Sequence, residues 1–163
     1  MYKATREFIA ARNKFANPYG IAHVPHVKRI GGGKQHECYQ NAASFIEKHS
    51  TNNEIGMWSG WLILPYDKET NSTLIFAHWW NIMKSGEQID TTPVSDNAEY
   101  VQDYSLLKFC AKNTQKLKTH LAHSLIYKDG IFFLIINPET NQCVPISELS
   151  NETLYLDKWV IES

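Results

Sequence analysis

The chain has 163 residues, of which 43% are hydrophobic, 12% aromatic and 20% charged, a composition that is typical of a folded protein and excludes an intrinsically disordered one. Its 16 basic and 17 acidic side chains nearly cancel to a formal charge of −1, which argues against wholesale binding to nucleic acid or membranes. The apolar runs "IFFLII" and "WLIL" are too short to span a bilayer, and "MYKATREFIAARNKF" lacks the apolar core of a signal peptide.

The length predicts one domain over residues 1–163 with a core that needs no disulfide staples. The three cysteines are odd in number and widely spaced, which suits neither a disulfide framework nor a CxxC metal site. They are Cys38, Cys110 and Cys143. We therefore expect a cytoplasmic protein in a reducing compartment, with no bound metal and no association with membranes.

The first third of the chain predicts two helices separated by a loop. Apolar residues recur at helical spacing over residues 2–15, and "NPYG" ends that pattern. Residues 21–34 contain Pro25 and three consecutive glycines, which favours a loop, so residues 1–33 form an N-terminal helix and a glycine-rich loop. From Cys38 to about His49 the apolar positions fall three and four apart, which predicts a helix with one stripe facing the core.

The middle of the chain predicts an antiparallel sheet. "WSGWLILPYD" and "STLIFAHWWNIM" are rich in aromatic and β-branched residues, with "DKETN" between them as a turn. A third strand, "EQIDTTP", follows the short turn "KSGE". With the helix at Cys38, these strands form a core over residues 34–93. The fold class that this order predicts is α+β, with the cysteine-bearing helix packed on a mainly antiparallel sheet.

Residues 94–163 predict a helical segment followed by strands. Helical propensity dominates from Asn97 to His123, whereas "IFFLIIN", the turn "PETNQ" and "CVPI" indicate a hairpin. "TLYLDKWVIE" is the candidate for a last strand. Two histidines in "KLKTHLAH", His120 and His123, suit a solvated helix face.

Cys38 stands at the predicted start of its helix, directly after the glycine loop. Unpaired N–H groups and the positive end of the helix dipole favour an ionised thiol at such a position. A thiolate there would be half of an activated nucleophile, and the other half is a histidine base oriented by a third group. Taken alone, Cys38 fits a buried, unreactive cysteine on an amphipathic helix better.

Among seven histidines, His78 is singled out by its place in a predicted hairpin. If the "KSGE" turn pivots at residues 85–86, Asp90 lies opposite Trp80, on the same face of the sheet as His78 and diagonally beside it. An aspartate in that position can orient an imidazole ring. Taken separately, each has a structural interpretation: His78 as a core histidine, and Asp90 as a strand-end cap ahead of Pro93.

The series "ECYQNA", "SGWLILP", "AHWWNI" and "GEQIDTTP" resembles the motifs of papain-like cysteine hydrolases in the broad sense, which includes the transglutaminase-like and NlpC/P60 families. It looks most similar to small uncharacterised bacterial and bacteriophage proteins with a cysteine helix, a Gly-Trp strand, a histidine strand and an "IDxT" strand. The resemblance covers about residues 34–93. It implies a papain-like fold and a cofactor-independent hydrolase or acyl transferase that acts on a protein or peptide-like substrate, in the host cytoplasm if the chain is phage-encoded.

By that resemblance Cys38 is the nucleophile, His78 the general base and acid, and Asp90 the orienting residue. The chain has no glutamine six residues ahead of the cysteine, where the papain pattern has one; Gln35 lies three residues ahead. We expect the main-chain N–H of Cys38, with Gln35 or Tyr39, to stabilise an oxyanion.

Three further residues are candidates for the cleft, each with a structural alternative. Asn41 lies nearly on the helical face of Cys38, where it can line the cleft, orient a loop or act as a cap. Trp61 and Trp79 are candidate substrate walls, although aromatic residues on strands usually belong to the core.

Two other kinds of protein stay open on sequence grounds. One is a non-catalytic bacterial or phage inhibitor that keeps the scaffold and binds a host protein through its aromatic surface. The other is a nucleic-acid binder acting through "AKNTQKLKTH", which the charge balance makes the weaker hypothesis. The "GGGK" segment lacks the spacing of a phosphate-binding loop, and His23, His26 and His36 do not form a defined metal-ligand set. The substrate and the oligomeric state are not determined by the sequence.

Overall fold

The computed structural model describes residues 1–15, 20–51, 54–112, 124–137 and 139–154. The helices and strands of these residues, in chain order, are α1 Lys3–Asn13, β1 Ala22–Val24, β2 Lys28–Arg29, α2 Cys38–His49, β3 Ile55–Ile63, β4 Thr73–Met83, β5 Gln88–Asp90, β6 Glu99–Gln102, α3 Tyr104–Lys112, β7 Ser124–Lys128, β8 Ile131–Asn137, β9 Gln142–Ile146 and α4 Asn151–Leu154. None of the described helices is long and apolar enough to cross a membrane.

The fold is built around the long antiparallel pair β3 and β4, which stay in register from Ile55 opposite Met83 to Ile63 opposite Ile75. Around this pair the described strands form one nine-stranded sheet in the order β1-β6-β3-β4-β7-β8-β9, with β5 also on β4 and β2 on β5. Only the β2–β5 pairing is parallel among these strands. The mixed helix and strand composition and the mainly antiparallel sheet confirm the predicted α+β class.

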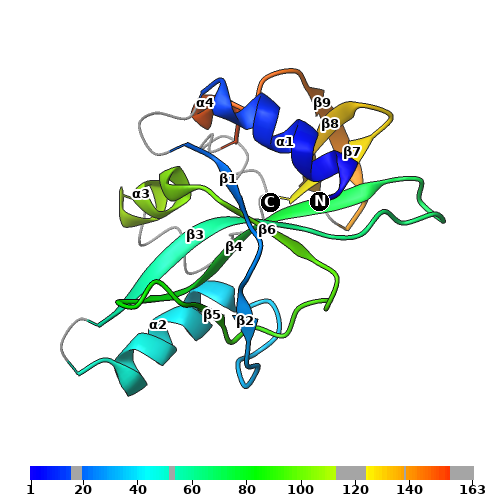
Figure 1. The fold of residues 1–163 in the computed structure, drawn as a ribbon. Helices are drawn as coiled ribbons and strands as arrows, with labels where there is room; N and C mark the ends of the chain where they lie inside the picture. Colours follow the sequence, from blue (N-terminus) through cyan, green and yellow to red (C-terminus); the bar gives the residue numbers. More distant parts are fainter. Residues whose placement is uncertain (16–19, 52–53, 113–123, 138, 155–163) are drawn as a thin grey trace.

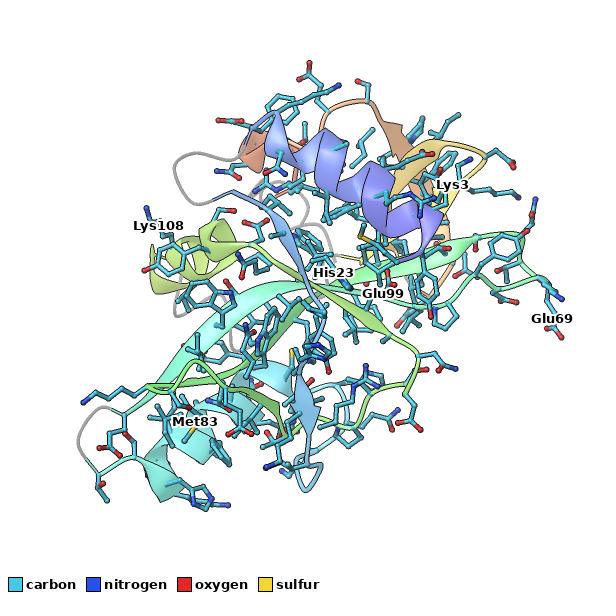
Figure 2. All side chains as sticks on the ribbon, viewed as in Figure 1. Lys3, His23, Glu69, Met83, Glu99 and Lys108 are labelled. Atoms are coloured by element: carbon cyan, nitrogen blue, oxygen red, sulfur yellow. The ribbon has the colours of Figure 1, made fainter. Side chains whose placement is uncertain are left out.

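The sheet is long, and different helices lie at its two ends. Figure 1 shows α1, in blue, near β7, β8 and β9, and α2, in cyan, at the opposite end near β5 and β2. Figure 2 shows the length of the central pair. Glu69 lies at the tip of the β3–β4 hairpin, and Met83 lies at the far end of β4. The α2 end carries the residues that the sequence singles out.

Alternation along the strands produces two apolar layers, one on each face of the sheet. One layer is covered by α1 and α2 and includes Phe8, Ala42, Trp61, Ile63, Ile75, Trp79 and Val101. The other layer includes Val24, Leu62, Trp80, Ala98 and Tyr100. His78 shares the parity of Trp80, so it points to the second layer and away from Trp79.

A buried ion pair joins α1 to the segment between β6 and α3. Arg12 Nε donates to Asp103 Oδ2 at 3.0 Å, and the two side chains are 0% and 1% exposed. Trp61 Nε1 donates to the same carboxylate oxygen at 2.9 Å, and Arg12 also donates to the main-chain oxygen of Leu149 at 2.6 Å. The N-terminal helix is therefore bonded to two distant parts of the chain, at Asp103 and Leu149.

The structure corrects three predictions about local structure and adds one strand. Residues 99–102, predicted as helix, form strand β6, because Tyr100 and Val101 are buried on opposite faces of the sheet. Residues 21–34 are not all loop, because β1 pairs with β6 and β2 with β5. Strand β7 was not anticipated. Residues 153–154, predicted as strand, lie in α4, which Ser150 caps by accepting the N–H of Thr153.

The remaining predictions beyond residue 93 divide between the described and the undescribed parts of the chain. The hairpin predicted from "IFFLIIN" and "CVPI" is confirmed as β8 and β9. Most of the basic stretch "AKNTQKLKTH", with His120 and His123, lies outside the described residues, as do residues 155–162 of the predicted last strand.

Candidate active site

The β4–β5 hairpin brings His78 and Asp90 together. The N–H of Met83 bonds to the oxygen of Glu87 and that of Gly86 to the oxygen of Met83, both at 2.8 Å, which closes a tight turn. Gly86 has a φ of +88°, a conformation that glycine adopts readily. The register of Asn81 opposite Ile89 places Asp90 beside Trp80, and therefore diagonal to His78, as predicted.

The two side chains form a buried hydrogen-bonded pair. His78 Nε2 donates to Asp90 Oδ2 at 2.6 Å, and the side chains are 2% and 1% exposed. The other carboxylate oxygen, Oδ1, accepts the N–H of Thr92 at 2.8 Å. Both oxygens of Asp90 are thus fixed, so the carboxylate can hold only one orientation toward the ring.

Tyr100 is a third partner of this pair, and sequence reasoning missed it. Its hydroxyl donates to Asp90 Oδ2 at 2.7 Å, the same oxygen that His78 contacts. Residues 97–123 were assigned to a helix, whereas in "EYVQ" Tyr100 and Val101 are both buried, one on each face of the sheet, as in a strand covered on both sides. The adjacent aromatic and β-branched residues, Tyr100 and Val101, were the signal that could have identified β6.

Cys38 is the first residue of α2, as predicted. The N-cap residue, Glu37, makes no side-chain capping bond, and the main-chain N–H of Asn41 donates to Glu37 at 2.8 Å. By helix geometry the N–H groups of residues 38–40 therefore precede the first intrahelical bond. The chain enters the helix through a turn in which His36 has a φ of +63°. This arrangement points the positive end of the helix dipole at the region around Cys38.

The glycine loop is fastened to the strand that carries Asp90. The N–H of Ile30 bonds to the oxygen of Asp90 at 3.0 Å, and the N–H of Gly33 to the oxygen of Thr91 at 2.9 Å. A Cβ at Gly33 would lie 2.5 Å from Asn41 Cγ and 2.7 Å from the oxygen of Thr91, so only glycine fits. The loop therefore sets the start of α2 relative to β5.

Asn41 completes this connection. Its Oδ1 accepts the N–H of Lys34 at 2.9 Å, and its Nδ2 donates to the oxygen of Lys34 at 2.7 Å and to Thr92 Oγ1 at 3.1 Å. The side chain is buried, so of its predicted alternatives the structure shows the one in which it orients the loop. Asn41 thus fixes Cys38 against the segment that follows Asp90.

The Cys38 side chain is half-buried and lies close enough to His78 for its thiol to help raise the pKa of the ring. Because Nε2 of the ring is bonded to Asp90, the nitrogen left for the sulfur is Nδ1. The next helical residue, Tyr39, packs edge-on against Trp79, with ring centroids 6.1 Å apart. The first turn of α2 therefore lies against residues 78–79 of β4.

This part of β4 has a free edge in the sheet of described residues. The second edge of β4 pairs with β7 through residues 73–76 and with β5 through residues 81–82. Residues 77–80 fall between these two pairings. The gap lets the start of α2 reach His78, which a continuous strand along that edge would cover.

The electrostatics of His78 favour its protonated form. Burial lowers the pKa of the ring, but the hydrogen bonds and charges of Asp90 and Cys38 outweigh burial and raise the pKa to about 9. For Asp90, burial raises the pKa, but His78, Tyr100 and the N–H of Thr92 lower it by more. The net result is a lowered pKa. The site therefore favours an imidazolium beside the carboxylate of Asp90.

Two aromatic rings enclose the imidazole. Trp80 stacks on His78 with centroids 6.1 Å apart and an angle of 22°, and Tyr100 meets the ring edge-on at 5.8 Å. Gly60 lies opposite His78 in the register, and a Cβ there would lie 2.0 Å from the oxygen of Val101. Gly60 is thus required by the close approach of β6, which carries Tyr100 to the site.

The remaining candidate residues have different outcomes. Gln35 is exposed in the turn before α2, and Tyr39 is half-buried beside Trp79. Trp61 and Trp79 are 0% exposed and belong to the core, so their assignment as substrate walls is wrong. Both point to the apolar layer under α1 and α2, on the face of the sheet opposite to His78.

A surface hollow runs along the glycine loop and one side of α2. Its lining includes Gly31, Gly32, Lys34, Gln40 and Phe45, but neither Cys38 nor His78. Cys38 itself is partly exposed outside this hollow. Among the described residues, no group of three or more histidine, cysteine, aspartate or glutamate side chains could hold a metal ion.

Comparisons with protein-family models, with curated proteins and with solved structures found no match. What the site can do must therefore be argued from its own geometry.

Proposed function

We propose that the chain is a cysteine-dependent hydrolase or acyl transferase that acts on an amide or ester bond through Cys38, His78 and Asp90. The observation that carries the proposal is the position of His78, which donates to Asp90 at 2.6 Å and has its pKa raised by the nearby Cys38 at the start of a helix. A nucleophile, a base and an orienting carboxylate in one hydrogen-bonded series are the parts that thiol catalysis requires.

In the proposed reaction the Cys38 thiolate attacks the carbonyl carbon of the substrate, forming a C–S bond and moving an electron pair onto the oxygen. In the proposal the main-chain N–H of Cys38 stabilises this charge. The intermediate collapses by breaking the bond to the amine or alcohol, which leaves with the proton of His78. Water or an amine then attacks the thioester carbonyl and gives a proton to His78. This step breaks the C–S bond, releases the acyl group and restores the thiolate.

The papain-like architecture belongs to this proposal. It is supported by the order of the elements, in which the helix with Cys38 precedes the strand with His78 and then the strand with Asp90. The same order underlies the resemblance to transglutaminase-like, NlpC/P60 and small phage proteins. The proposed substrate is a protein or peptide-like chain, as the resemblance implies.

A cytoplasmic location, in the host if the chain is phage-encoded, is also part of the proposal. The two cysteine side chains that the structure describes, Cys38 and Cys143, are free thiols. A thiol nucleophile persists in a reducing compartment, where disulfides are rare.

The proposal is tested by trapping the acyl-enzyme. The chain is incubated with p-nitrophenyl acetate, quenched with acid and mapped by peptide mass spectrometry, with Cys143→Ser as the matched control for Cys38→Ser. We expect an acetyl group on Cys38 in the wild type and in C143S, and a large loss of that adduct in His78→Gln. Equal acetylation of Cys38 and Cys143, or no effect of H78Q, would contradict the proposal.

One observation favours a second function, a non-catalytic binding or inhibitor protein on the same scaffold. His78 and Asp90 are 2% and 1% exposed, and the hollow beside α2 does not include Cys38. A pair this deeply buried is able to stabilise the fold without taking part in catalysis. If Cys38→Ser retained the full biological effect of the chain, this function would replace the enzymatic one.

A further inference from the structure

Tyr100 reaches the proposed catalytic series from a strand that the three catalytic candidates do not use. It lies on β6, which pairs with β3 through Tyr100 opposite Leu62, and its side chain is 2% exposed. Its hydroxyl donates to Asp90 Oδ2 at 2.7 Å, whereas His78 Nε2 approaches the same oxygen at 2.6 Å. Two donors therefore share one carboxylate oxygen.

Sharing one oxygen couples the two donors. A carboxylate oxygen that accepts a strong bond from a phenol carries less charge for a second donor. The hydroxyl of Tyr100 therefore competes with His78 for the charge of Asp90 while it holds that carboxylate in place. Tyr100 itself stays protonated, because burial and the charge of Asp90 raise its pKa.

Arg29 holds Tyr100 in this position. Its guanidinium lies 5.3 Å from the centroid of the Tyr100 ring and donates to the main-chain oxygen of Ala98 at 2.7 Å. Its strand, β2, pairs with β5 so that Arg29 is opposite Asp90. The titratable and charged groups that face His78, directly or through one partner, are thus Asp90 from β5, Cys38 from α2, Tyr100 from β6 and Arg29 from β2.

We propose that Tyr100 is a positioning residue of the active site, which fixes the Asp90 carboxylate and limits how tightly the carboxylate holds the proton of His78. This inference rests on the proposed function, since the proton of His78 is the one given to the leaving group. Removing the hydroxyl leaves Asp90 with a single strong donor on Oδ2. The carboxylate then attracts the imidazolium proton more strongly, and His78 releases it at a higher pH.

The test is an NMR titration of the His78 ring in the full chain labelled with ¹⁵N. The variant is Tyr100→Phe, and the matched control is Tyr127→Phe. Tyr127 lies on β7, in a distant part of the sheet, and also donates its hydroxyl to a carboxylate, that of Glu7 on α1. We expect the midpoint of His78 to rise by about 0.5 or more on the pH scale in Y100F, since a hydrogen bond to a charged group is lost. In Y127F the midpoint stays at the wild-type value.

A second measurement decides the matter if Y100F fails to fold. Incorporating 3-fluorotyrosine throughout the chain makes the Tyr100 hydroxyl a stronger donor with little change in shape, so the His78 midpoint falls. A midpoint that does not move, or that moves in the opposite direction, overturns the proposal in either experiment.

The result is separable from the proposed function. Alkylation of Cys38 by iodoacetamide in the wild type reports whether the thiol is activated at all. If it is not activated but the His78 midpoint responds to Y100F, the enzymatic function fails and the control of His78 by Tyr100 stands. If the thiol is activated and the midpoint does not respond, the positioning role of Tyr100 fails alone.

Discussion

His78 and Asp90, on adjacent antiparallel strands joined by a tight turn, share a buried hydrogen bond of 2.6 Å between Nε2 and Oδ2. The bond connects a ring that also contacts Cys38 to a carboxylate whose other oxygen is held by the main chain at Thr92. The same bond therefore influences both the stability of the fold and the chemistry proposed for Cys38, and each influence can be measured.

The first prediction concerns stability and pH. The pKa of His78 is raised from 6.5 to about 9 in the folded chain, so its contribution to stability is complete below about pH 6.5 and is lost as the pH rises through 9. The loss over this interval is up to about 3 kcal/mol, since one pKa unit corresponds to 1.36 kcal/mol. Urea unfolding at pH 6 and pH 9 measures it.

The control for this prediction is a pair of histidine variants. Replacing His78 by Gln removes most of the difference between pH 6 and pH 9, whereas replacing the exposed His26 by Gln leaves the difference unchanged. Equal pH dependence in the wild type and H78Q would show that His78 is not charged in the folded chain.

The second prediction concerns Asp90. Its pKa is lowered, so the stability that it contributes is present above the ordinary aspartate value of 3.8 and is lost as the pH falls below that value. Asp90→Asn keeps the shape and removes the charge, so the His78 midpoint in an NMR titration falls by at least about one unit, a tenfold change in its protonated fraction at high pH. An unchanged midpoint would mean that Asp90 does not hold the proton of His78.

The third prediction concerns the amide that fastens the glycine loop. Asn41→Ala removes three hydrogen bonds and leaves the main-chain groups of Lys34 without their partner, at a cost of about 2–3 kcal/mol in the free energy of unfolding. It also slows alkylation of Cys38, because the start of α2 is no longer fixed against β5. Gln40→Ala, at an exposed neighbouring position on the helix, changes neither quantity.

The fourth prediction concerns the glycines. Gly60→Ala places a Cβ 2.0 Å from the oxygen of Val101 and 2.7 Å from the Trp80 ring, so β6 must shift, with a loss of about 3 kcal/mol or more. Gly31→Ala meets nothing within 4 Å, and only its φ of +63° is unfavourable, so the loss is about 1 kcal/mol. Similar losses in the two variants would contradict the close packing of β6 beside His78.

The fifth prediction concerns the buried ion pair. Asp103→Ala leaves the guanidinium of Arg12 buried without its carboxylate, which lowers the free energy of unfolding by about 3–5 kcal/mol. Asp96→Ala provides the contrast, because the Asp96 side chain is fully exposed and lies 4.0 Å from Arg29, so the loss there is below about 1 kcal/mol. Chemical unfolding at pH 7 distinguishes the two cases.

The sequence could predict the parts of the site that depend on local rules. The β4–β5 turn is four residues long, so the parity of the strands alone determines which side chain lies beside His78. The start of α2 at Cys38 follows from the glycine run before it and the apolar spacing after it. These local patterns sufficed to place His78, Asp90 and Cys38.

The parts that escaped prediction depend on contacts between distant segments. Tyr100 reaches Asp90 because β6 pairs with β3, some forty residues earlier in the chain, and no periodicity of "EYVQ" identifies that partner. Strands β1 and β2 are two or three residues long and exist only through their pairing with β6 and β5. Trp79 was misassigned because the parity of the strand was not applied to it. Trp79 is next to His78 on β4, so its side chain points to the opposite face of the sheet.

The measurement that tests the enzymatic proposal most directly is the rate at which iodoacetamide modifies each cysteine at pH 6, followed by peptide mass spectrometry. An ordinary thiol with a pKa near 8.5 is only about 0.3% ionised at that pH, so it reacts slowly. Cys38, paired with the His78 imidazolium at a helix start, is predicted to react at least tenfold faster than Cys143 and Cys110, and to lose this advantage in H78Q. A rate for Cys38 no higher than that of the other two cysteines would contradict the proposal.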